Sequence, residues 1–176
     1  MRKYFLPLLW IVLFQPALSQ SMLKKAPAFE QYPVAVYEGK LSMPHLVTHE
    51  ELHFQTELRH AITKGYDVVE GGTENERIGP NFAGHYVLVQ WGCGTDCMEA
   101  AIINVVDGHI FGPPHIPEDQ DSTGFHVPTG QADMRTLQFR TKSRLLGIPY
   151  VGNGMTYWYA LEKGWRFIGK SATPAG

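Results

Sequence analysis

The segment HEELH at residues 49–53 matches the H-E-x-x-H pattern of zinc hydrolases. On a helix, its two histidines would share one face and bind zinc through neutral imidazole, while the glutamate polarised a bound water. Two features argue against such a site. Thr48 should cap the helix and leave His49 at its electropositive first position, and no third ligand follows at the spacing of extended zinc-protease motifs. We expect no metal or cofactor, and zinc on His49 and His53 is the alternative.

The only two cysteines, Cys93 and Cys97, lie in the segment WGCGTDC (91–97). A redox pair would favour C-x-x-C spacing, and a metal site would need further soft ligands. A cysteine nucleophile would need a free thiolate and a base, for which His85 is the candidate. In an oxidising compartment, however, two cysteines this close should pair across a tight hairpin loop. We predict a disulfide, with a cysteine nucleophile near His85 as the alternative.

The compartment is inferred from the first residues of the chain. A short basic start is followed by an apolar run, too short to span a bilayer, and then by Ala17-Leu18-Ser19. This order is typical of a secretory signal peptide. We expect a signal peptide at 1–19, an arm rich in Lys, Pro and Ala at 20–33 and a single domain at 34–176. The mature protein should be exported, periplasmic or secreted, and not bound to the membrane.

The charge composition of the chain limits which classes of partner it can bind. The chain carries 15 Lys and Arg against 17 Asp and Glu, a net charge of -2, with the two signs interspersed. Such a balance gives no electrostatic basis for binding nucleic acid or an anionic membrane. A partner should therefore be a protein or a small ligand in the cell envelope.

The elements that would position these residues follow from local patterns. Thr48 and Glu51 form a capping box, and apolar residues at helical spacing predict one amphipathic helix over 49–64. Apolar runs rich in β-branched and aromatic residues predict six main strands. These lie at 85–91, 98–106, 109–111, 145–151, 156–162 and 165–170. Alternation over 34–41 predicts a further, N-terminal strand. The fold class is α+β, an antiparallel β-meander of about six strands with one main helix packed on it.

Residues 79–97 carry a resemblance to known proteins. Gly-Pro-Asn-Phe-Ala-Gly-His-Tyr (79–86), followed by a strand and the G-C-G-T-x-C hairpin, is similar to a widespread group of uncharacterised exported bacterial proteins. The resemblance covers about residues 52 to 111, and it departs where 66–78 looks inserted. It implies a small α+β domain and no particular activity.

Two further features are candidates for function. The segment 112–130 gathers five residues able to bind hard cations, at a spacing that fits no known loop motif. They are His115, Glu118, Asp119, Asp121 and His126. The C-terminal hairpin is rich in aromatic residues that should mostly complete the core. They are Tyr157, Trp158, Tyr159, Trp165 and Phe167.

The sequence thus favours a non-enzymatic binding module over an enzyme. Its candidate interaction residues surround the two cysteines and the N-F-A-G-H-Y segment. They are Asn81, His85, Trp91 and Asp96. A hydrolase, using zinc on His49 and His53 or a cysteine near His85, is the alternative.

Overall fold

The protein consists of two antiparallel sheets and a short helical pair. The computed structural model describes residues 21–65, 78–94, 97–117, 124–127 and 137–173. The helical elements are η1 (Phe29–Gln31), α1 (His49–His53), α2 (Gln55–Thr63) and η2 (Val151–Asn153). The first sheet holds β1 (Tyr86–Gly94), β2 (Cys97–Asn104), β3 (Ile110–Phe111) and β4 (His126–Val127). The second holds β5 (Gln138–Arg140), β6 (Ser143–Tyr150), β7 (Met155–Leu161) and β8 (Trp165–Ala172). Antiparallel sheets with few helices fit the expected α+β class, and they fit a mostly-β class as well.

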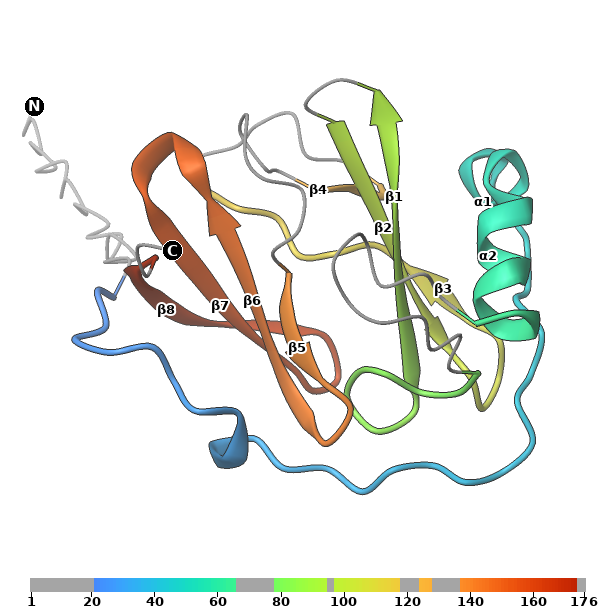
Figure 1. Ribbon diagram of the computed structural model, residues 1–176, viewed down its shortest axis with the longest axis horizontal. Coiled ribbons are helices and arrows are strands. Elements are labelled where there is room, and N and C mark those ends of the chain that lie inside the picture. Colours follow the sequence, from blue (N-terminus) through green and yellow to red (C-terminus); the bar gives the residue numbers. More distant parts are fainter. Residues whose placement is uncertain (1–20, 66–77, 95–96, 118–123, 128–136, 174–176) are drawn as a thin grey trace, which may run out of the picture.

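The strands do not form the single six-stranded meander that we expected. In the first sheet β1 pairs with β2, and β2 pairs in turn with the short strands β3 and β4. The second sheet is a four-stranded meander in the order β5-β6-β7-β8. Figure 1 shows the two sheets as separate layers, with α1 and α2 beside the first sheet on the side away from the second.

Two hydrophobic clusters separate the three layers. The cluster between the sheets includes Leu88 and Ile102 from the first sheet and Tyr157 and Tyr159 from the second. The opposite face of the first sheet packs Val87 and other residues against the helices. The first sheet is therefore covered on both faces, which explains why β1 and β2 read as continuous apolar runs rather than as alternating ones.

The expected single helix is two short helices with a break at Phe54. The capping box is confirmed, because the Glu51 amide donates to Thr48 Oγ1 while the Glu51 carboxylate accepts the Thr48 amide. Phe54 leaves helical geometry at φ −97° and ψ 22°. Its ring centroid lies 5.0 Å from that of Trp91 and 6.2 Å from that of Phe125. The bend places the Phe54 ring on the first sheet, a tertiary contact that helical periodicity does not encode.

The N-terminal residues 21–47, here called the strap, run along both sheets (Figure 1). The strand expected at 34–41 is wrong. This part is extended, but its bonds go to different elements: the Tyr37 amide donates to Gly84 O and the Ser42 amide to Val105 O. The alternating sequence predicted a strand because an extended segment with one buried side alternates its side chains just as a strand does. The pattern does not show whether a neighbouring strand is there to pair with it.

The arm expected at 20–33 packs on the second sheet. Met22 forms a bridge with Lys170, and the Phe29 ring meets Trp158 edge to face at a centroid distance of 6.2 Å. Trp158 points away from Tyr157 and Tyr159, and Phe29 covers it there. The prediction that these three aromatic residues belong to the core is confirmed, since each is at most 4 % exposed.

Candidate functional site

The chain before β1 forms a tight turn held by a buried asparagine. The Asn81 side chain donates to Leu88 O at 2.8 Å and accepts from the Leu88 amide at 2.7 Å. It thereby satisfies both backbone groups of one residue, as a neighbouring strand would. Asn81 is only 5 % exposed. We expected it to contact a partner, but its position suits it instead to fixing the turn against β1.

The same turn joins the two sheets to the strap. The Ala83 amide donates to Ser143 O and the Gly84 amide to Thr141 O, both in the second sheet. Ala83 and Gly84 have φ values of 42° and 78°. A Cβ at Gly84 would lie 2.2 Å from Ala35 O of the strap. Glycine is required at position 84 for both reasons, which accounts for the glycine of the N-F-A-G-H-Y segment.

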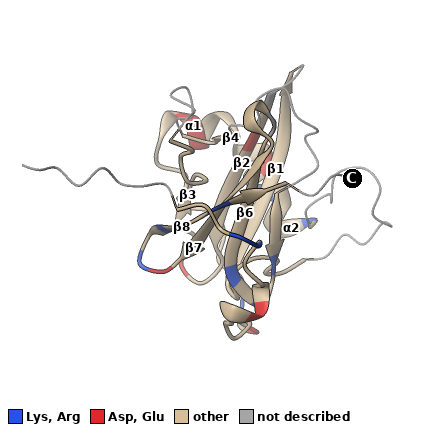
Figure 2. Ribbon diagram, turned by 90° about the vertical axis from the view of Figure 1, so that its left-hand side faces the viewer, with Lys and Arg blue, Asp and Glu red and all other residues tan. Residues whose placement is uncertain are grey.

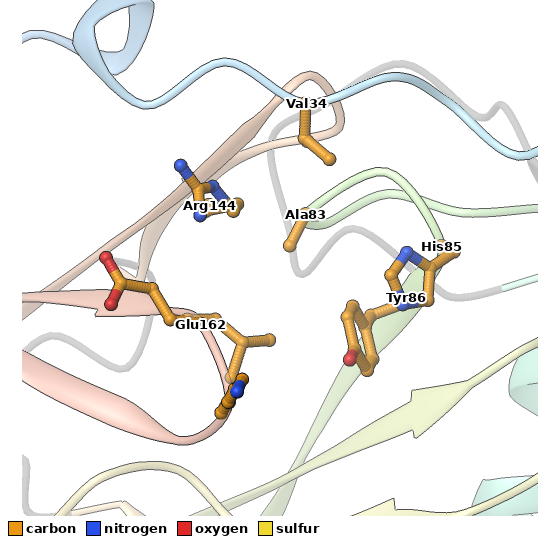
Figure 3. A pocket seen from close by; sticks show the side chains of 8 residues that line it. Val34, Ala83, His85, Tyr86, Arg144 and Glu162 are labelled. Atoms are coloured by element: carbon orange, nitrogen blue, oxygen red, sulfur yellow. The ribbon is translucent and has the colours of Figure 1, made fainter.

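A cavity of about 480 Å³ lies beside this turn. Figure 3 shows Arg144 and Glu162 on the left, His85 and Tyr86 on the right, Ala83 between the two sides and Val34 at the top. These residues come from three segments: the strap, the turn that enters β1, and the second sheet. The cavity is thus built where the two sheets and the strap meet.

The charged residues around this cavity differ in whether they have a hydrogen-bond partner. Glu162 accepts from Arg166 Nη2 at 2.8 Å and from Arg166 Nε at 3.1 Å. This bond, with the charges of Arg166 and Arg144, lowers the pKa of Glu162. The Nε atom of Arg144 is buried and has no hydrogen-bond partner within the residues described. A buried guanidinium donor without an acceptor is costly, and so it is the least satisfied group of the site.

His85 and Tyr86 stand side by side, with ring centroids 4.2 Å apart. Desolvation lowers the pKa of His85 from 6.5, and the charge of Asp107 partly opposes this. Desolvation and Asp107 both raise the pKa of Tyr86. Both side chains are therefore favoured in their neutral forms near pH 7, where each can donate one hydrogen bond.

The cysteines lie at the other end of β1. Gly94 faces Cys97 and Gly92 faces Met98, so Cys93 is the extra residue of a bulge. Cys93 is exposed, and Gly94 has φ 136°. The side chain of Cys97 and the whole of Asp96 fall outside the described residues, as does the signal peptide expected at 1–19. The disulfide and the role of Asp96 accordingly stay predictions.

The proposed base His85 is not near the cysteine. His85 immediately precedes β1 and Cys93 is its penultimate residue. Eight residues of strand separate them by roughly 26 Å at about 3.3 Å per residue. The expectation that His85 lies within reach of Cys93 is wrong, because the two occupy opposite ends of one strand rather than facing sides of a hairpin.

Trp91 is part of the packing between the first sheet and the helices. Its Nε1 donates to Glu99 Oε2 at 2.7 Å, and its ring meets Phe125 at a centroid distance of 5.9 Å. Trp91 is half-buried by these contacts. It is therefore held inward, by partners that come from α1–α2 and the chain before β4.

The HEELH segment is used for structure. Glu50 Oε1 accepts from the Phe125 amide at 2.9 Å, and Glu51 caps α1. His49 and His53 are exposed at the two ends of α1. No group of three metal-binding side chains is found among the described residues. Glu50, which would be the general base in the zinc alternative, accepts a hydrogen bond from a backbone amide.

The loop 112–130 is described only at 112–117 and 124–127. Tyr159 donates to His115 O, Trp165 Nε1 donates to Gly112 O at 3.2 Å, and His126 opens β4 opposite Glu99. Of the candidate cation ligands, Glu118, Asp119 and Asp121 lie outside the described residues. The described parts are attached to both sheets.

Sequence reasoning missed Arg144 and Glu162. Arg144 lies on β6, fifty-nine residues after His85, inside a run that reads simply as a strand. No local signal brings these two positions together. The only hint available was the arginine itself, since an Arg within an otherwise apolar strand calls for a partner.

A second cavity, of about 510 Å³, is lined by Val36, Glu38, Arg140 and Lys142 among others. It borders Ile78, where the described chain resumes, and its charged residues lie on the strap, at the end of β5 and in the β5–β6 turn. We propose no functional site at this second cavity.

Charged residues are sparse over the body of the molecule. Figure 2 shows Lys and Arg together with Asp and Glu at scattered places, without a large region of one sign on this face. Within the described residues, no helix is long and apolar enough to cross a membrane. Comparisons of the chain with protein families, curated proteins and solved structures found no match.

Proposed function

We propose that the protein is an exported, non-enzymatic binding module that takes a small ligand in the cavity beside His85. The observation that carries the proposal is the cavity itself. Its volume, about 480 Å³, lies within the roughly 300–1,000 Å³ of known small-molecule sites. Apolar walls with a few convergent polar groups are also typical of such sites.

Binding is favoured over catalysis by what lines the cavity. Among the described residues that line it are imidazole, phenol, guanidinium and carboxylate groups, but no serine, threonine or cysteine to act as a nucleophile. The hydrolase alternatives lack support for related reasons: Cys93 stands far from His85, and Glu50 is bonded to the Phe125 amide.

Export and the disulfide belong to the same proposal. A signal peptide at 1–19 would deliver the chain to an oxidising compartment, where Cys93 and Cys97 would pair. The bulge at Cys93 and the start of β2 at Cys97 bring the two backbones together at the hairpin end. The ligand would then be one found in the periplasm or outside the cell.

The test is a fragment screen on the mature protein, followed by amide chemical shifts. Ligands of this site should shift the amides of His85 and Tyr86. Val34→Phe, on the cavity wall, should abolish those shifts because the larger ring occupies the space. Val36→Phe is the matched control, since Val36 lies two residues away on the strap and lines the second cavity. Fragments that bind Val34→Phe as well as the wild type, or a library without any hit at the site, would refute the proposal.

The zinc alternative has its own measurement. Metal analysis after dialysis, on the wild type and on His53→Ala, should find no stoichiometric zinc in either protein. Near-stoichiometric zinc that the substitution removes would favour the hydrolase over the binding module.

A further inference from the structure

The inference concerns the chemical class of the ligand, and it rests on the binding function proposed above. It starts from the charge balance of the cavity. Two cationic side chains, Arg144 and Lys163, line it together with one carboxylate, Glu162. Because Arg166 holds that carboxylate through two of its own donors, the negative charge is already matched from outside the cavity.

Arg144 is the cationic residue of the cavity whose surroundings say most about a ligand. Its amide is bound to Tyr32 O, which fixes the backbone of β6 beside the strap. Its Nε is shielded from solvent and has no acceptor within the described residues. Protein interiors rarely leave such a donor unsatisfied, and each exception calls for an explanation. The shielded Nε is out of reach of a ligand, but the side chain as a whole is only partly buried and lines the cavity. A guanidinium group there can pair with the oxygens of a carboxylate.

The remaining walls suit an apolar body. Val34, Ala83 and Leu161 contribute aliphatic surface, and the Tyr86 ring adds an aromatic face. An inorganic anion would leave these walls uncovered, whereas a carboxylate on a hydrocarbon or aromatic skeleton would cover them. His85, held neutral by its burial, can donate one further hydrogen bond to the ligand.

We infer that the cavity binds an organic carboxylate, whose charged group pairs with Arg144 and whose apolar part lies against Val34, Ala83 and Leu161. The position of Glu162 determines whether Arg144 is free to bind the carboxylate. Held by Arg166, it leaves Arg144 to the ligand, and without that restraint it would compete with the ligand for Arg144.

The experiment compares acids with their amides, which have nearly the same shape. Benzoate and benzamide, hexanoate and hexanamide, and indole-3-acetate and indole-3-acetamide are titrated into the mature protein by NMR. Each acid should bind at least about tenfold more tightly than its amide, because the charge-assisted bond to Arg144 is lost in the amide. Shifts at His85 and Tyr86 locate the binding.

Variants then identify the residue responsible. Arg144→Gln should remove the preference for the acid and leave amide binding nearly unchanged. Arg166→Gln should weaken acid binding severalfold, since it frees Glu162 to pair with Arg144. Arg140→Gln is the control, because Arg140 lies on β5 over the Phe29 ring, away from this cavity. The acid–amide comparison on the wild type needs no variant, so it decides the question even if Arg144→Gln does not fold.

The outcomes separate this inference from the proposed function. Amides that bind at His85 and Tyr86 as tightly as the acids would overturn the carboxylate and leave the binding module in place. The same holds if Arg144→Gln keeps the acid preference. If neither this panel nor the wider fragment screen shifts those amides, both are refuted.

Discussion

Strand β1 joins two regions that are fixed by different means. At its start, the Asn81–Tyr86 turn is held by hydrogen bonds from backbone and amide groups to the second sheet, the strap and Leu88. Near its end, Trp91 is held by aromatic packing on Phe54 and Phe125. The first region tolerates few residue types because hydrogen bonds are directional. The second depends mainly on the buried area and the shape of its side chains.

The two ends of β1 hold residues that the sequence places close together. Asn81, His85, Trp91 and the cysteines fall within seventeen residues, which suggested one site around the disulfide. A strand places them at two ends roughly 26 Å apart. The cavity belongs to the turn end alone, so changes at the two ends should have separable effects on stability and on ligand binding.

The largest effect should come from Asn81→Ala. The substitution leaves the Leu88 amide and carbonyl buried without partners, so the free energy of unfolding should fall by about 3 kcal/mol. Chemical denaturation measures this loss. Gln90→Ala is the control: Gln90 lies on β1, two residues after Leu88, and its Oε1 has no hydrogen-bond partner within the described part of the chain. It should cost less than about 1 kcal/mol, and equal losses would contradict the assigned role of Asn81.

The next effect tests the hairpin end. If Cys93 and Cys97 are bonded, replacing both by serine should cost about 2 kcal/mol at most, because the closed loop is very short. The wild type under reducing conditions should match the double variant in denaturation. A thiol titration of the unfolded, unreduced protein should find none, and a count of two would contradict the disulfide.

A smaller loss is expected for Trp91→Phe. It removes the bond to Glu99 but keeps an aromatic ring between Phe54 and Phe125, so the cost should be about 1 kcal/mol. The amide shifts of His85 and Tyr86, and any ligand affinity measured there, should not change. If ligand binding weakens in this variant, the two ends of β1 are coupled and the division drawn between them fails.

The smallest effect is a pH dependence at the turn end. The pKa of His85 is lowered from 6.5 by desolvation, so the unfolded chain binds the proton more readily than the folded one. His85 therefore costs no stability well above pH 6.5, and the penalty grows as the pH falls through 6.5 toward the folded pKa. His85→Gln should reduce the loss of unfolding free energy between about pH 8 and about pH 5. An unchanged or steeper loss would contradict a desolvated imidazole.

Much of the secondary structure was predictable because it depends on neighbouring residues. All six expected main strands overlap observed ones, and the Thr48–Glu51 capping box is present as predicted. The failures share one cause, contacts between distant parts of the chain. The Phe54 ring bends the helix toward Trp91, and the strap at 34–41 is extended without a ladder.

The candidate site was predictable only in part. His85 was singled out by the segment that carries it, but its expected neighbour Cys93 is far away and its observed companion Arg144 was not considered. The two cysteines were easy to notice because cysteine is rare. Arg144 was not, because its importance lies in a missing acceptor, which only atomic positions reveal.

By itself, the sequence determined most of the elements and some of their details: the places of six strands, the start of α1 and its capping box. These follow from side-chain period and capping, which act over a few residues. Tertiary structure decided that the strands divide into two sheets, and it brought Arg144 and His85 to one cavity. The physical reason is that both faces of the first sheet are buried, one against the second sheet and the other against the helices. Such burial depends on how the whole chain packs.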